Sequence, residues 1–159
     1  MLIPMPFGIF GSLKHMSDVA RLKLVVFRVG ELTCAVPAAI VREVIAQQPA
    51  TRIPGAVAEV DGLINVRGTL LTVFDARRAV DGRGTAAAEG SVLVVETRGR
   101  ALGLAVDEVL DLLEVSEDQL DPRESLPGVD PRLARAVGRD GKRVFVVLDT
   151  DALLAPLLG

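Results

Sequence analysis

The sequence predicts an all-β fold with short helices, in which two small β-barrels or sheets pack together. Short apolar segments separated by turn residues follow one another from residue 22 to residue 148. The apolar residues are mainly Val, Leu, Ala and Ile, with five Phe and no Trp or Tyr, and β-branched residues favour strands. The two halves also resemble each other, because residues 24–26 and Gly30 recur as residues 93–95 and Gly99. About ten strands in two related units exceed what one small barrel holds, so we expect two subdomains.

The first half begins with three expected strands, which cover residues 22–29, 32–36 and 41–45. Gly30 and Glu31 form the turn between the first two strands. Pro37 ends the second strand, because proline has no N–H group to donate to a neighbouring strand. The third segment mixes apolar and polar side chains in alternation, which is the pattern of a strand buried on one face.

Two further strands, at residues 62–66 and 70–74, form an expected hairpin around Arg67 and Gly68. Gly68 at the second central position permits the positive φ that a tight turn needs there. Arg67 is therefore expected at the tip of the hairpin, in solvent.

The second half follows residues 81–90, a polar and glycine-rich stretch that we interpret as a linker. Its expected strands and apolar segments are residues 92–96, 101–106, 109–115, 134–138 and 144–148. Asp140 and Gly141 give the strongest hairpin signal of the chain, and we expect them to join the last two strands.

The acidic residues are assigned structural roles. Asp75 and Asp149 end equivalent strands of the two halves, and each is expected to cap a helix, which runs to Val80 and Leu158 respectively. An acidic cluster is the best metal candidate, but it lacks the Asp-x-Asp-x-Asp-Gly spacing of a calcium loop. Its members are Asp107, Glu108, Asp111, Glu114, Glu117, Asp118 and Asp121. We interpret the cluster as a solvated face, with a small metal-dependent enzyme as the alternative.

Residues 1–17 are left outside the predicted fold. They are apolar but interrupted by Pro and Gly, and they lack the basic n-region and the A-x-A-like cleavage site of a signal peptide. No apolar run approaches the roughly 18 residues of a membrane span, so we expect no direct membrane insertion. We expect a disordered extension or a non-native start here, followed at residues 18–159 by one domain of two interleaved β-barrel subdomains.

Composition and motifs argue against catalysis, a cofactor and nucleic-acid binding. The formal net charge is −3, with both signs interspersed, whereas binding to nucleic acid requires a basic face. The only histidine, His15, precedes the predicted fold, and the only cysteine, Cys34, lies in an apolar stretch typical of a core. The sequence contains no G-x-x-x-x-G-K-[ST] phosphate loop. We therefore expect no catalytic residue, no cofactor and no metal.

Arg67 is the side chain whose position suggests recognition. Its planar guanidinium suits a carboxylate or carbonyl group of a partner, and a tight hairpin would fix its position. Glu43, on a neighbouring strand, is a candidate to orient it. On the residues alone, an arginine at a hairpin tip is also a common solubilising residue, so both interpretations stay open.

Several segments resemble the CheW domain family. The most specific is Gly-x-x-Asn-x-Arg-Gly at residues 62–68, which continues into a strand-Asp-x-Arg pattern at residues 71–77. The other similar segments are residues 24–27, 41–45, 52–55, 92–95, 103–109, 119–122 and 146–149. The resemblance covers about residues 22–156.

This resemblance implies two five-stranded β-barrels packed side by side, in an adaptor that is not an enzyme. Such an adaptor would couple the cytoplasmic tip of a methyl-accepting chemotaxis receptor to the regulatory domain of a CheA-type histidine kinase, in the cytoplasm at receptor arrays. Partner-binding residues of the family carry over to Arg67, Glu43, Val41 and Gly62. A CheW-like module of a non-flagellar pathway, controlling surface motility or gene expression, is the alternative.

Overall fold

The computed structural model describes residues 21–82, 86, 88–124 and 126–158. The expected N-terminal extension, residues 1–17, lies outside the described residues. The strands are β1 (Arg21–Val29), β2 (Leu32–Pro37), β3 (Val41–Ala46), β4 (Val60–Val66), β5 (Thr69–Asp75), β6 (Ser91–Thr97), β7 (Arg100–Val106), β8 (Glu108–Ser116), β9 (Leu120–Asp121), β10 (Ala134–Asp140) and β11 (Arg143–Leu148). The helices are α1 (Ala76–Asp81) and α2 (Thr150–Leu158), with short 3-10 turns η2 (Ala38–Ile40), η3 (Glu117–Gln119) and η4 (Pro131–Leu133). In this part of the chain, no helix has the length and apolar character needed to cross a bilayer.

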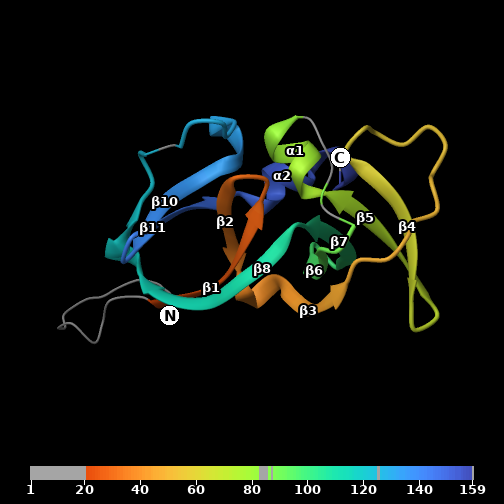
Figure 1. The fold of residues 1–159 in the computed structure, drawn as a ribbon, viewed down its shortest axis with the longest axis horizontal. Helices are drawn as coiled ribbons and strands as arrows, with labels where there is room; N and C mark the ends of the chain where they lie inside the picture. The colour runs from red at the N-terminus through yellow and green to blue at the C-terminus, as the bar shows by residue number, and fades with distance from the viewer. Residues whose placement is uncertain (1–20, 83–85, 87, 125, 159) are drawn as a thin grey trace.

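The strands form two packed sheets, which confirms the predicted all-β fold with short helices. One sheet has the order β8-β1-β2-β11-β10-β9 and the other β3-β6-β7-β5-β4. Figure 1 shows them side by side along the long axis, with α1 and α2 between them at one face. The second sheet has the expected five strands, whereas the two-residue β9 adds a sixth to the first. This extra strand forms because Leu120 packs against the apolar interior while its backbone pairs with Gly138.

Each sheet combines the first two strands of one half of the chain with the later strands of the other half: β1 and β2 with β8 to β11, and β6 and β7 with β3 to β5. Thus β3 pairs with β6, and β8 pairs with β1, both antiparallel. The contacts β2–β11 and β7–β5 are both parallel. Apart from β9, the two sheets therefore share one arrangement. The similar segments at residues 24–30 and 93–99 include β1 and β6, which occupy the same place in the two sheets.

Apolar side chains are buried in three clusters, one between the sheets and one inside each sheet. β1 contributes to two of them. Leu24 and Val26 lie in the cluster inside the six-stranded sheet, whereas Val25 and Phe27 face the central cluster. Successive side chains of a strand point to opposite faces, so a strand buried on both faces needs a continuous apolar run. Burying a side chain such as Phe27, which is 0% exposed, contributes about 1.5–3 kcal/mol.

Both predicted aspartate caps are confirmed. Asp75 Oδ1 accepts a hydrogen bond from Arg78 N, and Asp149 Oδ1 accepts one from Ala152 N, each at 3.1 Å. Each bond satisfies one of the amide groups that the first turn of a helix leaves unpaired.

The stretch expected to be a linker, residues 81–90, is partly anchored. Asp75 accepts a second hydrogen bond, from the amide of Ala86 at 3.1 Å. Ala86 is buried in the cluster inside the five-stranded sheet. The segment is therefore not a free connection at this residue; residues 83–85 and 87 lie outside the described residues.

The hairpin between β10 and β11 differs from the prediction by one residue. Asp140 pairs with Arg143, so the turn consists of Gly141 and Lys142. Gly141 has a φ of 60°, and glycine at the first central position supplies the positive φ of a type II′ turn. Arg143 therefore begins β11, and its side chain donates hydrogen bonds to Asp111 of β8 and to Asp140.

Candidate partner-binding surface

The hairpin of β4 and β5 ends in the tight turn of Arg67 and Gly68. Val66 pairs with Thr69, and both turn residues have positive φ, 50° for Arg67 and 86° for Gly68. Two positive φ values match the type I′ turn, whose twist suits the flanking strands. Asn65 Oδ1 accepts a hydrogen bond from Gly68 N at 2.8 Å, which fixes the turn. The side chain of Arg67 is 70% exposed, so it stands at the hairpin tip, as predicted.

Arg67 itself adopts the left-handed conformation, with positive φ, that was expected only for Gly68. A left-handed backbone costs about 1–2 kcal/mol for a residue with a Cβ atom. Residues held in such conformations are concentrated at functional sites, where the surrounding structure fixes them. Arg98 adopts the same conformation, with a φ of 53°, before Gly99 in the turn between β6 and β7. The left-handed backbone therefore does not by itself distinguish Arg67.

The guanidinium of Arg67 is paired with Glu43 of β3. Arg67 Nη2 donates a hydrogen bond to Glu43 Oε2, and the two groups form an ion pair. This hydrogen bond and the negative charge of Glu43 hold the pKa of Arg67 above its usual value. The predicted contact is confirmed, but the strands are not neighbours, because β3 and β4 are the opposite edges of the five-stranded sheet. The pair therefore joins the two edges where the twisted sheet curls towards itself.

The backbone of Thr51, which follows β3, joins the same two edges. Thr51 and Leu63 of β4 exchange two backbone hydrogen bonds of 2.8 Å. Gly62 is buried at this junction, where a Cβ atom would lie 2.4 Å from Thr51 O. Its φ of 149° also belongs to a region that is essentially restricted to glycine. The backbone contact itself therefore requires glycine at residue 62.

Val41 is two positions before Glu43, but a bulge in the pairing with β6 separates them: Val41 pairs with Val95 and Glu43 with Val94. Val41 is half-buried and packs against the central cluster. Of the four residues selected by the resemblance, Arg67 and Glu43 meet at the surface. Gly62 lies at the junction of the two sheet edges that the pair joins, whereas Val41 packs against the central cluster.

Several apolar side chains are exposed on strands, and the sequence analysis did not single them out. Leu112 of β8 and Leu70 of β5 are each 65% exposed, Val44 of β3 is 47% exposed and Leu110 of β8 is 38% exposed. β3 and β8 are edge strands. The alternation expected for residues 41–45 is not kept in β3, because a bulge lies between Val41 and Glu43, and Val44 is exposed while Glu43 is half-buried.

The acidic cluster is dispersed along β8 and neighbouring residues, and several of its carboxylates are paired with arginines. The ion pairs of β8 are Glu108–Arg28 at 3.5 Å, Asp111–Arg143 at 2.9 Å and Glu114–Arg21 at 3.7 Å. The hydrogen bond from Arg143 lowers the pKa of Asp111. Among the described residues, no three His, Cys, Asp or Glu side chains are grouped so that they could hold a metal ion. These pairs are those of a charged, solvated face, and they give no support to the alternative of a metal-dependent enzyme.

The chain matches a protein family over most of its length. A family model described as the CheW-like domain matches residues 23–157. Chemotaxis protein CheW of Rhizobium meliloti is 34% identical over 145 residues, which cover 88% of this chain and 91% of that protein. Chemotaxis protein CheW of Bacillus subtilis is 26% identical over 135 residues, which cover 83% and 86%.

The fold is also that of a solved relative. The crystal structure of the scaffolding protein TtCheW from Thermoanaerobacter tengcongensis matches with a TM-score of 0.73 at 23% identity, over 82% of this chain and 90% of that chain. At this level of identity the likeness concerns the fold, whereas the family match rests on the sequence. This chain belongs to the CheW-like domain family.

Proposed function

We propose that this chain is an adaptor of bacterial chemotaxis that performs no catalysis and couples a methyl-accepting receptor to a CheA-type histidine kinase. The partners would be the cytoplasmic tip of the receptor and the regulatory domain of the kinase. Family membership and relatives named chemotaxis protein CheW support a role in chemotaxis. The observation that carries the proposal is the Arg67–Glu43 pair, a fixed and exposed charged group at the edge of a rigid sheet.

The geometry of Arg67 suits contact with a partner. A guanidinium carries five N–H donors in a fixed fork, and Glu43 accepts from Nη2, so other donors are available to a carboxylate or carbonyl group. The turn and Glu43 hold the side chain in place before a partner arrives. Binding then loses less side-chain entropy than it would with a free arginine.

An adaptor also needs a second surface, and the exposed leucines of β8 are our candidate for it. Leu110 and Leu112 project from the edge strand of the six-stranded sheet. Figure 1 shows β8 in one half of the molecule and the β4–β5 hairpin at the far end of the other half. Exposed apolar side chains favour contact with an apolar face of a partner. We propose that one partner uses the surface at Arg67 and the other the surface at Leu112.

Neither contact needs to be large. A transient signalling contact commonly buries less than about 1,200 Å², and repeated contacts in an array strengthen weak binding through effective concentration. We propose that the protein acts in the cytoplasm and reaches the membrane only through the receptors of such arrays. The same surfaces would serve a non-flagellar chemosensory pathway, so the neighbouring genes are needed to distinguish the two cases.

A charge reversal at Arg67 tests the proposal. Arg67→Glu removes a charged hydrogen-bond donor that contributes about 1.5–3 kcal/mol, so binding to at least one partner should weaken about 10- to 100-fold. The free energy of unfolding should change by no more than about 0.5 kcal/mol, as for most surface substitutions. Binding is measured separately to the kinase regulatory domain and to a receptor tip fragment, followed by kinase activity in a reconstituted ternary complex.

Arg139→Glu is the matched control. Arg139 is 55% exposed on β10 and forms an ion pair with Glu124, 2.9 Å from Arg139 Nη2 to Glu124 Oε2. We expect this variant to bind both partners like the unmodified protein. If Arg67→Glu supports full kinase coupling, or if the unmodified protein binds neither partner, the proposed function is wrong.

A further inference from the structure

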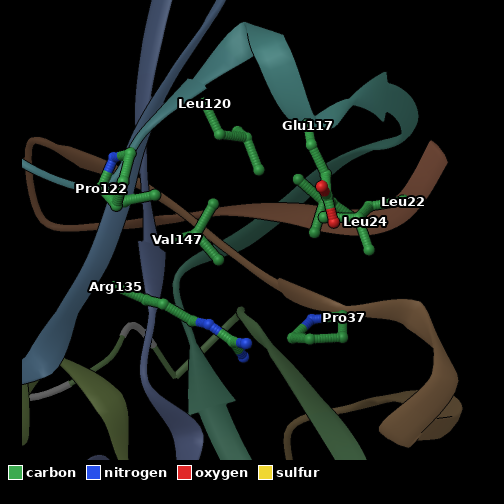
Figure 2. Close-up of a pocket in the computed structure, with 9 residues that line it drawn as sticks. Leu22, Leu24, Pro37, Glu117, Leu120, Pro122, Arg135 and Val147 are labelled. Carbon is green, nitrogen blue, oxygen red and sulfur yellow. The ribbon is translucent and has the colours of Figure 1, made fainter. Parts of the chain in front are cut away.

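An apolar groove opens at one end of the six-stranded sheet, and Figure 2 shows side chains of β1, β2, β9, β10 and β11 around it. Its volume is about 330 Å³. Leu24, Ala136 and Val147 line it and also belong to the apolar cluster inside the sheet. Leu22 and Leu120, which line it as well, remain partly exposed. A groove that is continuous with a core and open to water favours an apolar occupant.

The chain carries a segment of matching chemistry before β1. The first charged side chain of the sequence is Lys14. The large apolar residues that precede it are Leu2, Ile3, Met5, Phe7, Ile9, Phe10 and Leu13. The three other phenylalanines of the chain are fully buried in its cores. Pro4 and Pro6 restrict the backbone to extended conformations, and a chain that is already restricted loses less entropy when it binds in a groove.

The place where residues 2–10 connect to the fold favours them, rather than a free ligand, as the occupant of the groove. β1 begins at Arg21, and Leu22 already lines the groove. Residues 11–20 connect the apolar segment to β1, and ten residues span at most about 33–36 Å. This length is sufficient to turn back and bring residues 2–10 to the groove. A short tether also gives an effective concentration in the millimolar range, so that weak contacts suffice.

Charged side chains of both signs line the groove, Arg135 and Glu117, so charge alone does not select the occupant. Glu117 lines the groove, and Asp118 follows it in η3. In the sequence, Lys14 follows the apolar segment directly. With the apolar residues in the groove, this cation would come near the carboxylates, and opposite charges attract over such distances.

We propose that residues 2–10 bind in this groove of their own chain and cover it. The occupant is a segment of the same molecule, and the groove is lined by strands of the six-stranded sheet, away from the Arg67–Glu43 pair. The segment would act as a built-in competitor of any partner that requires the groove. This inference does not depend on the proposed coupling of receptor and kinase.

Disulfide trapping in the full chain tests the inference. Ile9→Cys is combined with Pro122→Cys at the groove or, as a control, with Leu70→Cys, which is also exposed but lies on the other sheet. Cys34 is fully buried and burial raises its pKa to about 12, so it stays protonated and unreactive at neutral pH. Oxidised glutathione is added, and the intramolecular disulfide is followed by intact mass, after correction for the reactivity of each exposed thiol. Glu117→Cys provides a second groove position if Pro122→Cys impairs folding.

The intramolecular disulfide should form about tenfold or more faster with the groove cysteine than with the control, because binding raises the local thiol concentration. Adding Phe7→Ser and Phe10→Ser should lower the groove rate to that of the control. Equal rates at the two positions would overturn the inference. So would disulfides that form only between two molecules, or a groove rate that the serine substitutions leave unchanged.

Discussion

Replacing Gly62 by alanine should release the sheet edge that holds Arg67. The added Cβ would lie 2.4 Å from Thr51 O and 2.8 Å from Thr51 C, so the backbone at residue 51 must move. The φ of 149° adds strain of about 1–3 kcal/mol for a residue other than glycine. The two hydrogen bonds between Thr51 and Leu63 contribute about 0.5–1.5 kcal/mol each. After about 0.4–1 kcal/mol is subtracted for reduced entropy of the unfolded chain, the free energy of unfolding should fall by about 1–5.6 kcal/mol.

Gly55→Ala is the matched control, because Gly55 lies in the loop before β4, has a φ of 78° and has open space at the Cβ position. Its left-handed backbone costs about 1–2 kcal/mol for alanine, partly offset by the reduced entropy of the unfolded chain, so the net loss should be about 0–1.6 kcal/mol. The chain has no Trp or Tyr, so urea unfolding is followed by far-ultraviolet circular dichroism rather than fluorescence. If Gly62→Ala is as stable as Gly55→Ala, the close approach of Thr51 does not hold the edge. If it is stable but does not bind a partner, Gly62 is a contact residue instead.

Three further predictions concern single side chains. Arg67→Gly should keep or raise the free energy of unfolding, because relief of a left-handed backbone (about 1–2 kcal/mol) outweighs the loss of an exposed ion pair (about 0–1 kcal/mol). Partner binding should weaken. A large loss of stability, measured by urea unfolding, would contradict the stability prediction. The pKa of Asp111 lies below the ordinary 3.8, so its pairing with Arg143 stabilises the fold above pH 3.8, and this stabilisation is lost as the pH falls through the folded pKa. The difference in unfolding midpoint between the unmodified protein and Asp111→Asn should therefore vanish in acid. A difference that stays constant with pH would exclude this coupling. Because the pKa of Cys34 is raised to about 12, Ellman's reagent at pH 8 should label the thiol only after urea unfolding, and rapid labelling of the native protein would show that residue 34 is accessible.

The local features of this fold could be predicted from the sequence because their causes are local. The apolar run at residues 24–27 predicted a strand, and the structure shows it buried on both faces. Asp75 and Asp149 predicted two helix starts, because a carboxylate that follows a strand can satisfy free amide groups. The tip position of Arg67 followed from Gly68. Each of these inferences needs only neighbours in the sequence.

The long-range pairings could not be predicted in the same way. Apolar strands resemble one another, so the sequence does not specify that β3 pairs with β6 rather than with β4. The Arg67–Glu43 contact was predicted from proximity on neighbouring strands, whereas the structure forms it between opposite edges of one sheet. Its cause is the curl of the sheet, which depends on the packing of all five strands.

Exposure was the least predictable property of the surface. Leu112 and Val44 are apolar residues in strands, and a sequence pattern assigns such residues to a buried face. β3 and β8 lie at sheet edges, so one face of each is not fully covered by a neighbouring layer. Only the tertiary arrangement identifies those faces. The need for glycine at residue 62 also could not be predicted from neighbouring residues, because it depends on the backbone of Thr51, eleven residues earlier in the chain.

The distribution of both halves of the chain over the two sheets has a mechanical consequence for an adaptor. Each sheet contains strands from both halves of the chain, and the central cluster takes side chains from both sheets. The chain passes from one sheet to the other after β2 and again after β7, and separating the sheets would expose the central cluster between them. This exposure is costly, because protein interiors are close-packed. The surface at Arg67 and the surface at Leu112 are thus fixed relative to each other, so a partner that displaces one of them must displace the other as well.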